Sequence, residues 1–201
     1  MNPEAPRVAF VVFDRMTALD FIGIYDPVTR LKSMGFRPGL TWDVCGLTPS
    51  ARDDRGLSVN VTRVGEPLGA YDVLIVPGGF GTRALKEDAR FVSWLKTAAA
   101  ADYKVSVCTG ALLLGAAGFL EGKPATTHPA EYEALRPYCG TVVPARIVEA
   151  GGVITGGGVT SAIDVGLYVV ERLAGEEVRG AIAKQMDYPY AVPPGGVVRT
   201  G

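Results

Sequence analysis

Unbroken apolar runs rich in β-forming residues constrain the fold of this chain more than any other feature. Arg7–Phe13 (RVAFVVF) and Asp72–Val76 (DVLIV) are two such runs, and Lys104–Val107 (KVSV) is a shorter one. A strand with one solvated face alternates apolar and polar residues, whereas an unbroken run is typical of a strand buried on both faces. These segments therefore predict strands of a mostly parallel sheet that helices cover on both sides.

The remaining segments supply those helices and the outer strands. Between Thr17 and Met34 apolar residues recur at helical spacing, and Asp88 has the side chain and position of a helix N-cap. Other helices are predicted over Thr109–Ala117, after Gly156–Gly158 and over Glu176–Met186; other strands over Thr41–Leu47 and Arg55–Val64, with a hairpin over Arg146–Thr155. Strands that alternate with helices indicate a three-layer α/β sandwich. We expect a single domain over residues 1–201, with extended termini at 1–6 and from about 190 to 201.

Composition disfavours several classes of protein. The formal net charge is -1, and Lys and Arg are scattered, so we expect neither nucleic acid nor a membrane as a partner. The apolar run near the N-terminus is too short for a signal peptide or a membrane span. Because no targeting segment is recognised, the cytoplasm is the expected location.

The cysteine and histidine content points to thiol chemistry rather than to a metal. Cys45, Cys108 and Cys139 are far apart and odd in number, which argues against a disulfide framework. His128 is the single histidine and the chain has no CxxC pair, so we expect no protein-only metal site. One of the three cysteines is then a candidate reactive thiol.

Cys108 has the position of a nucleophile. A predicted buried strand runs directly into Cys108, and a helix of small and apolar residues follows. A residue on such a turn lies at the carboxyl edge of the sheet, where α/β folds bind ligands, and beside helix amides that favour a thiolate. A low thiol pKa is therefore expected. A buried core cysteine is the competing interpretation, and the position at a strand end argues against it. Cys45 lies inside a predicted strand and Cys139 beside a turn, so both are expected to be inert.

Two further segments are predicted to reach the same edge of the sheet. Gly78 and Gly79 follow a buried strand, and their amides, with that of Thr109, are candidates for holding negative charge that develops on a substrate. Asp20 follows the first strand and lies near the start of the next helix. Its position fits a proton-transfer group and, equally, an aspartate placed favourably at a helix N-terminus.

These segments together resemble the ThiJ/PfpI superfamily and, within it, the isocyanide (isonitrile) hydratases. The matching stretches are FDRMTALDFIGIYD, DDRGL, DVLIVPGGFGT, SVCTGALLLGAAGFLEGKPATTH, ITGGGVTSAIDVGL and QMDYPY, which occur in the same order over most of the chain. The resemblance implies a flavodoxin-like sandwich, a homodimer and a small-molecule substrate, with no metal or organic cofactor. It implies that Cys108 is the nucleophile, that Asp20 is the catalytic carboxylate, that Thr109 assists, and that the Gly78–Gly79 turn lines the pocket.

The implied reaction adds water to an isocyanide, R–N≡C, and releases an N-substituted formamide. Cys108 would attack the terminal carbon and form a thioimidate, while Asp20 donates a proton and later activates water. The thiolate beside Asp20 is expected to raise the pKa of that carboxyl.

Two alternatives stay open. Protease-like and amidotransferase-like relatives have histidine directly after the nucleophile, where this chain has Thr109, so peptide hydrolysis is disfavoured. The TTHP segment at 126–129 resembles the glyoxalase or deglycase branch, in which Cys108 would add to a 2-oxoaldehyde and His128 would move protons. The competing interpretation of His128 is a loop residue that caps a helix near Pro129. The second alternative is a non-catalytic, redox-sensing protein whose Cys108 oxidises to a sulfinate.

Overall fold

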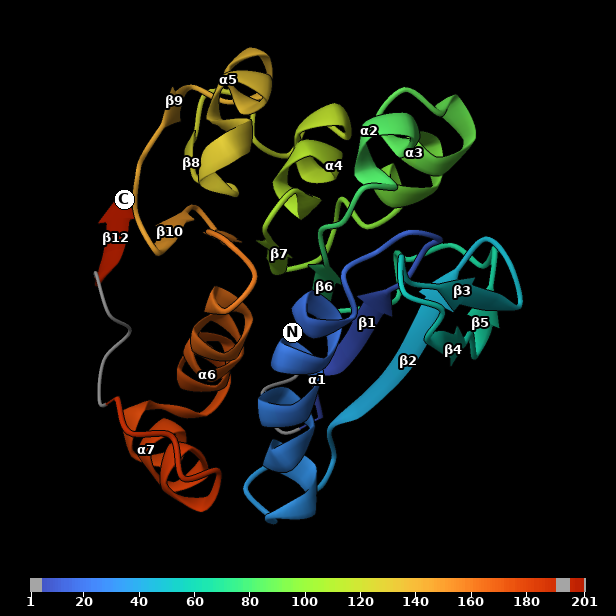
Figure 1. The fold of residues 1–201 in the computed structure, drawn as a ribbon. Coiled ribbons are helices and arrows are strands. Elements are labelled where there is room, and N and C mark those ends of the chain that lie inside the picture. Colours follow the sequence, from blue (N-terminus) through green and yellow to red (C-terminus); the bar gives the residue numbers. More distant parts are fainter. Residues whose placement is uncertain (1–4, 191–195, 201) are drawn as a thin grey trace.

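A central eight-stranded sheet organises the protein (Figure 1), of which the computed structural model describes residues 5–190 and 196–200. The strands lie in the order β12-β10-β11-β7-β6-β1-β2-β5, and among the strands described every neighbouring pair is parallel except β10 and β11. Their bounds are β1 Arg7–Val11, β2 Thr41–Gly46, β5 Arg63–Val64, β6 Val73–Val76, β7 Tyr103–Val107, β10 Ile147–Ala150, β11 Val153–Gly156 and β12 Val197–Thr200.

Helices cover both faces of this sheet, which makes the molecule the three-layer α/β sandwich that the sequence predicts (Figure 1). One layer contains α1 (Ala18–Ser33), α6 (Ser161–Ala174) and α7 (Glu176–Gln185), which contact one another. The other contains α2 (Thr82–Leu85), α3 (Ala89–Lys96), α4 (Gly110–Ala116) and α5 (Tyr132–Leu135), with single 3₁₀ turns at Pro129–Glu131 and Arg136–Tyr138 on either side of α5.

Local chemistry explains why these elements begin and cross where they do. Asp88 caps α3 as predicted, since its carboxylate accepts hydrogen bonds from the amides of Arg90 and Phe91. Helices α1 and α6 approach closely because Gly23 leaves room for a neighbour: a Cβ there would lie 2.6 Å from that of Ala162. This close crossing holds α1 against α6, and α1 carries Asp20 in its first turn.

One prediction about local structure needs correction. The predicted strand over Arg55–Val64 is two separate strands, β4 (Ser58–Asn60) and β5, because β4 pairs with β3 (Ser50–Arg52) outside the central sheet. A second small sheet joins β8 (Pro124–Ala125) to β9 (Thr141–Val142). Helix α6 is buried on nearly all sides, since α1, α7 and the sheet surround it.

The C-terminal part of the predicted extended tail belongs to the sheet. Val197–Thr200 forms β12 and pairs with β10 in parallel. Residues 1–4, 191–195 and 201, which the predictions for the two termini include, lie outside the described residues. Within residues 5–190 and 196–200, no helix has the length and apolar character needed to cross a membrane.

Candidate active site

The turn that carries Cys108 is strained and firmly held. Cys108 lies between β7 and α4 with φ of 55°, a left-handed conformation that few residues other than glycine adopt. Its N–H donates to the carbonyl oxygens of Gly157 (2.8 Å) and Gly156 (3.1 Å), and its own carbonyl accepts from the hydroxyl of Thr127 at 2.8 Å. Strain of this kind persists only where the surroundings hold it, and it is concentrated at functional sites. The elbow predicted at Cys108 is therefore present, and Thr127 with the Gly156–Gly157 turn maintains it.

Asp20 meets Cys108 across the backbone of Gly78. The Asp20 side chain is fully buried, and its Oδ2 accepts the Gly78 N–H at 3.0 Å. The Gly78 carbonyl in turn accepts the N–H of Thr17 at 2.8 Å, which ties the start of α1 to the end of β6. A Cβ on Gly78 would lie 2.6 Å from the amide nitrogen of Thr109 and 2.8 Å from both Asp20 Oδ2 and Cys108 Cβ. Only glycine fits here, so the carboxyl and the thiol flank the same point.

Burial shifts both titrating groups of this pair. It raises the pKa of Asp20 to about 7, against the opposing hydrogen bonds from Gly78 and Cys108. The direction agrees with the sequence-based expectation, but burial is the main cause rather than a neighbouring thiolate. Burial and then the charge of Asp20 raise the pKa of Cys108 to about 12, although interactions with Thr109 oppose this. The expected low-pKa thiol is therefore wrong, because burial and the charge of Asp20 outweigh the hydrogen bonds from Thr109.

The amides of Gly78 and Gly79 already have partners. Gly78 donates to Asp20, and Gly79 donates to the hydroxyl oxygen of Thr109 at 2.9 Å. The Thr109 hydroxyl donates back to the Gly79 carbonyl at 3.1 Å. In this structure these two amides orient Asp20 and Thr109, and their role in holding developing negative charge stays a prediction. The Thr109 hydroxyl holds the Gly79 turn.

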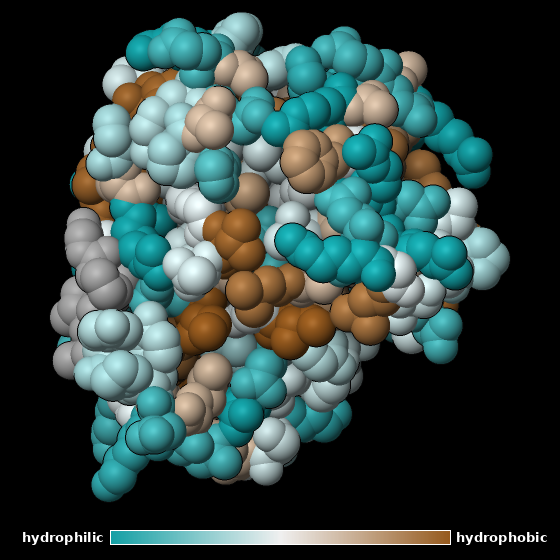
Figure 2. Space-filling model, in the orientation of Figure 1, coloured by the Kyte–Doolittle hydropathy of each residue, from teal (hydrophilic) through white to brown (hydrophobic). Residues whose placement is uncertain are grey.

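An open cleft of about 610 Å³ gives access to Cys108. Gly79, Cys108 and Thr109 form part of its wall, whereas Asp20 lies buried behind them. Other lining side chains are the apolar Leu19, Phe80 and Val159, the charged Asp54, Arg55, Arg83 and Glu131, and His128 at the side. In Figure 2, apolar residues gather where α1 begins, with hydrophilic residues around them. Sequence reasoning singled out His128 but missed the apolar and charged side chains of this wall, because they come from several segments far apart in the chain.

His128 has the cap role that one interpretation assigned to it. Its Nδ1 accepts the N–H of Ala130 at 3.2 Å, which caps the 3₁₀ turn Pro129–Glu131. Because Nδ1 is the acceptor, a neutral His128 carries its proton on Nε2. His128 also lines the same cleft as Cys108, so both interpretations keep a structural basis. Among residues 5–190 and 196–200, no group of three or more His, Cys, Asp or Glu side chains is arranged to hold a metal ion.

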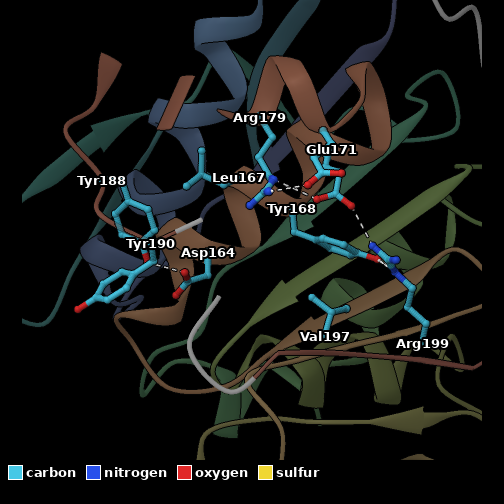
Figure 3. Close-up of a pocket in the computed structure, with 10 residues that line it drawn as sticks. Asp164, Leu167, Tyr168, Glu171, Arg179, Tyr188, Tyr190, Val197 and Arg199 are labelled. Atoms are coloured by element: carbon cyan, nitrogen blue, oxygen red, sulfur yellow. Dashed lines mark hydrogen bonds and ion pairs between the residues drawn. The ribbon is translucent and has the colours of Figure 1, made fainter. Parts of the chain in front are cut away.

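A second, more enclosed pocket of about 280 Å³ lies elsewhere, between α6, α7 and β12 (Figure 3). Its charged side chains pair with one another: Glu171 accepts from Arg179 at 3.1 Å and from Arg199 at 2.9 Å, and Tyr188 bonds to Asp164. None of the predicted site residues lines it. The Arg199–Glu171 pair joins β12 to α6, and the other two pairs join α7 and the segment after it to α6, so we assign this pocket a structural role.

Comparison with known proteins identifies the family of this chain. Residues 6–172 match the DJ-1/PfpI family. The chain belongs to the DJ-1/PfpI family. It is 38% identical over 192 residues to a protein from Pseudomonas putida named isonitrile hydratase, a match that covers 94% of this chain and 81% of that protein. It is also 30% identical over 139 residues to DJ-1alpha of Drosophila melanogaster, covering 68% of this chain and 62% of that protein.

Solved structures of family members share the fold. A ThiJ/PfpI family protein from Pseudomonas syringae superposes with a TM-score of 0.82 at 30% identity, covering 94% of this chain and 78% of that one. Drosophila melanogaster DJ-1beta superposes with a TM-score of 0.79 at 22% identity, covering 92% of this chain and all of that one. The flavodoxin-like fold implied by the motifs is therefore confirmed.

Proposed function

We propose that this protein is an isonitrile hydratase that converts R–N≡C and water to R–NH–CHO through a covalent adduct on Cys108. The observation that carries the proposal is the pair of Asp20 and Cys108, held on either side of Gly78, with Cys108 on the wall of an open cleft and Asp20 buried behind it. The similarity to the Pseudomonas putida protein named isonitrile hydratase supports the same reaction.

In the first step the Cys108 thiol adds to the terminal carbon of the isocyanide. With a pKa of about 7 on Asp20 and about 12 on Cys108, the pair holds a thiol beside a carboxylate just above neutral pH. Asp20 takes the thiol proton as sulfur attacks, and then delivers it to the former isocyanide carbon. The product is the thioimidate R–N=CH–S–Cys108, and Asp20 is again a carboxylate. In this step Asp20 acts as a general base on the Cys108 thiol at the moment of attack. The sequence instead predicts that Cys108 is already a thiolate before the substrate binds.

The second step hydrolyses this adduct. Asp20 removes a proton from water as the oxygen adds to the thioimidate carbon, and the nitrogen gains a proton. The resulting R–NH–CH(OH)–S–Cys108 then breaks its C–S bond, which releases R–NH–CHO and restores the Cys108 thiol. No oxyanion has to be held by the Gly78 and Gly79 amides in the first step, which is consistent with their existing partners.

A product assay tests the proposal. Purified protein is incubated with alkyl and aryl isocyanides and, separately, with 2-oxoaldehydes, and products are identified by NMR. Formamide formation that disappears in Cys108→Ser is the expected result. Hydroxy-acid formation from 2-oxoaldehydes without formamide would refute it.

A glyoxalase-type activity is the second candidate, because His128 lines the same cleft as Cys108. In that reaction Cys108 would add to the aldehyde carbon and His128 would move the proton between the two carbons. Turnover of either substrate class also excludes the non-catalytic, redox-sensing alternative.

The expected homodimer, the cytoplasmic location and the single-domain organisation remain predictions. Sedimentation velocity would measure the oligomeric state directly.

A further inference from the structure

Phe80 presents an unusually exposed aromatic ring to the cleft. Its side chain is 55% exposed although it is large and apolar, and it directly follows Gly79, which Thr109 holds by two hydrogen bonds. The guanidinium of Arg83 lies 4.8 Å from the ring centroid, and that of Arg15 lies 5.8 Å from it. Contacts of this kind are favourable and bias the orientation of the ring. Phe80 thus offers an aromatic surface to a ligand in the cleft that contains Cys108.

The cations around this ring are each compensated. Arg83 forms an ion pair with Glu131, and Arg15 forms one with Asp54 at 3.4 Å. Arg55 is the other cation on the cleft wall. It lies close to Asp53, and its positive charge contributes to lowering the pKa of that carboxyl. A substrate that carries an anionic group would have to compete with these carboxylates for an arginine. The charged side chains of this cleft therefore give an anionic substrate little gain in binding.

The wall of the cleft offers a ligand apolar contacts. Leu19 from α1, Phe80 from the loop after β6, and Val159 from the loop before α6 line the cleft. Leu19 and Phe80 are largely exposed, so a ligand that covers them removes apolar surface from water. We refer to Leu19, Phe80 and Val159 as the apolar wall.

We propose that the apolar wall determines the specificity for the N-substituent of the isocyanide, and that it selects an uncharged, apolar group. Glu131 contributes because it pairs with Arg83 and so makes that guanidinium less available to an anionic substituent. This inference rests on the proposed hydratase function, because the N-substituent is the variable part of that substrate. Phe80 is the central residue, since its exposed aromatic ring lines the same cleft as Cys108 and contacts two arginines.

The first experiment compares benzyl isocyanide with methyl isocyanide. The ratio of their kcat/KM values is measured for the wild type, Phe80→Ala and Phe80→Leu. We expect the benzyl-to-methyl ratio to fall about 10-fold in Phe80→Ala, with partial recovery in Phe80→Leu. Val64→Ala is the control, because Val64 is 44% exposed on β5 and does not line the cleft. An unchanged ratio in Phe80→Ala would overturn the proposal.

The second experiment tests the exclusion of anions. Wild-type enzyme should prefer the methyl ester of isocyanoacetate to isocyanoacetate itself. Glu131→Gln should raise the relative kcat/KM for the anion about 3- to 5-fold, and added salt should reduce that gain. The control is Glu133→Gln, which removes the carboxylate that pairs with Arg136 outside the cleft wall.

A wild-type preference for isocyanoacetate over its ester would overturn the inference while leaving the hydratase function intact. Absence of turnover with every isocyanide would instead refute the hydratase function, and the inference with it. The two failures are therefore distinguishable.

Discussion

Replacing Asp20 by asparagine should make the protein more stable, and increasingly so as the pH rises. The substitution keeps the shape of the side chain and an oxygen that can accept the Gly78 N–H. It removes a carboxyl whose pKa burial raises from 3.8 to about 7. An acid with a raised pKa in the folded state binds its proton more tightly there than in the unfolded chain. This tighter proton binding stabilises the folded state fully below pH 3.8. The stabilisation is lost as the pH rises toward 7, and above pH 7 the stability no longer changes with the ionisation of Asp20.

The size of the effect follows from that shift. A rise of roughly three pKa units corresponds to about 4 kcal/mol of lost stability once Asp20 is ionised. Between pH 5 and pH 8.5, the wild type should lose roughly 3 kcal/mol relative to Asp20→Asn, because part of the loss has already occurred at pH 5. Groups whose titration does not depend on Asp20 cancel in this difference.

Urea unfolding followed by the fluorescence of Trp42 and Trp94 measures the two free energies of unfolding at each pH. Asp43→Asn is a matched control. Burial acts to raise the pKa of Asp43, but hydrogen bonds from Tyr71 and Thr62 and the charge of Arg63 hold it below 3.8. Its effect should therefore be the same at pH 5 and pH 8.5. A gap between Asp20→Asn and wild type that does not change with pH would refute the reasoning.

Four further predictions concern activity. Cys108→Ser should lower formamide production at least about 10²-fold, and acid-quenched wild type under excess isocyanide should gain the substrate mass on the peptide that contains Cys108. The wild-type kcat/KM for an isocyanide should rise with pH through about 7 and then level off, because Asp20 must be ionised to accept the thiol proton; a flat profile would remove Asp20 from this step. His128→Ala should keep most hydratase activity, whereas a loss of about 10²-fold would support a proton-transfer role for His128. Gly78→Ala should reduce kcat about 10²-fold while circular dichroism stays native, since a Cβ there would lie 2.6 Å from the Thr109 amide nitrogen; wild-type activity would show that the Asp20–Cys108 arrangement tolerates displacement.

Several features of the fold follow from neighbouring residues alone, and for these the sequence is sufficient. The buried runs Arg7–Phe13 and Asp72–Val76 predict β1 and β6, because an unbroken apolar run needs cover on both faces. Asp88 predicts the start of α3, since a cap is satisfied within three residues. The elbow at Cys108 was likewise predictable, because a strand that runs directly into a small-residue helix leaves the residue between them at the sheet edge.

The chemistry of the site depends on contacts between residues far apart in the chain. Asp20 bonds to Gly78, which lies 58 positions later, and the Cys108 carbonyl accepts the Thr127 hydroxyl from 19 positions later. The sequence places a thiol at a helix start and so predicts a low pKa, but that pKa depends on how much solvent the folded chain removes around Cys108. Tertiary packing likewise determines which groups the Gly78 and Gly79 amides bond to and which side chains form the cleft wall. Local pattern specifies which residues reach the sheet edge, whereas three-dimensional packing sets which atoms meet there and how strongly each holds its proton.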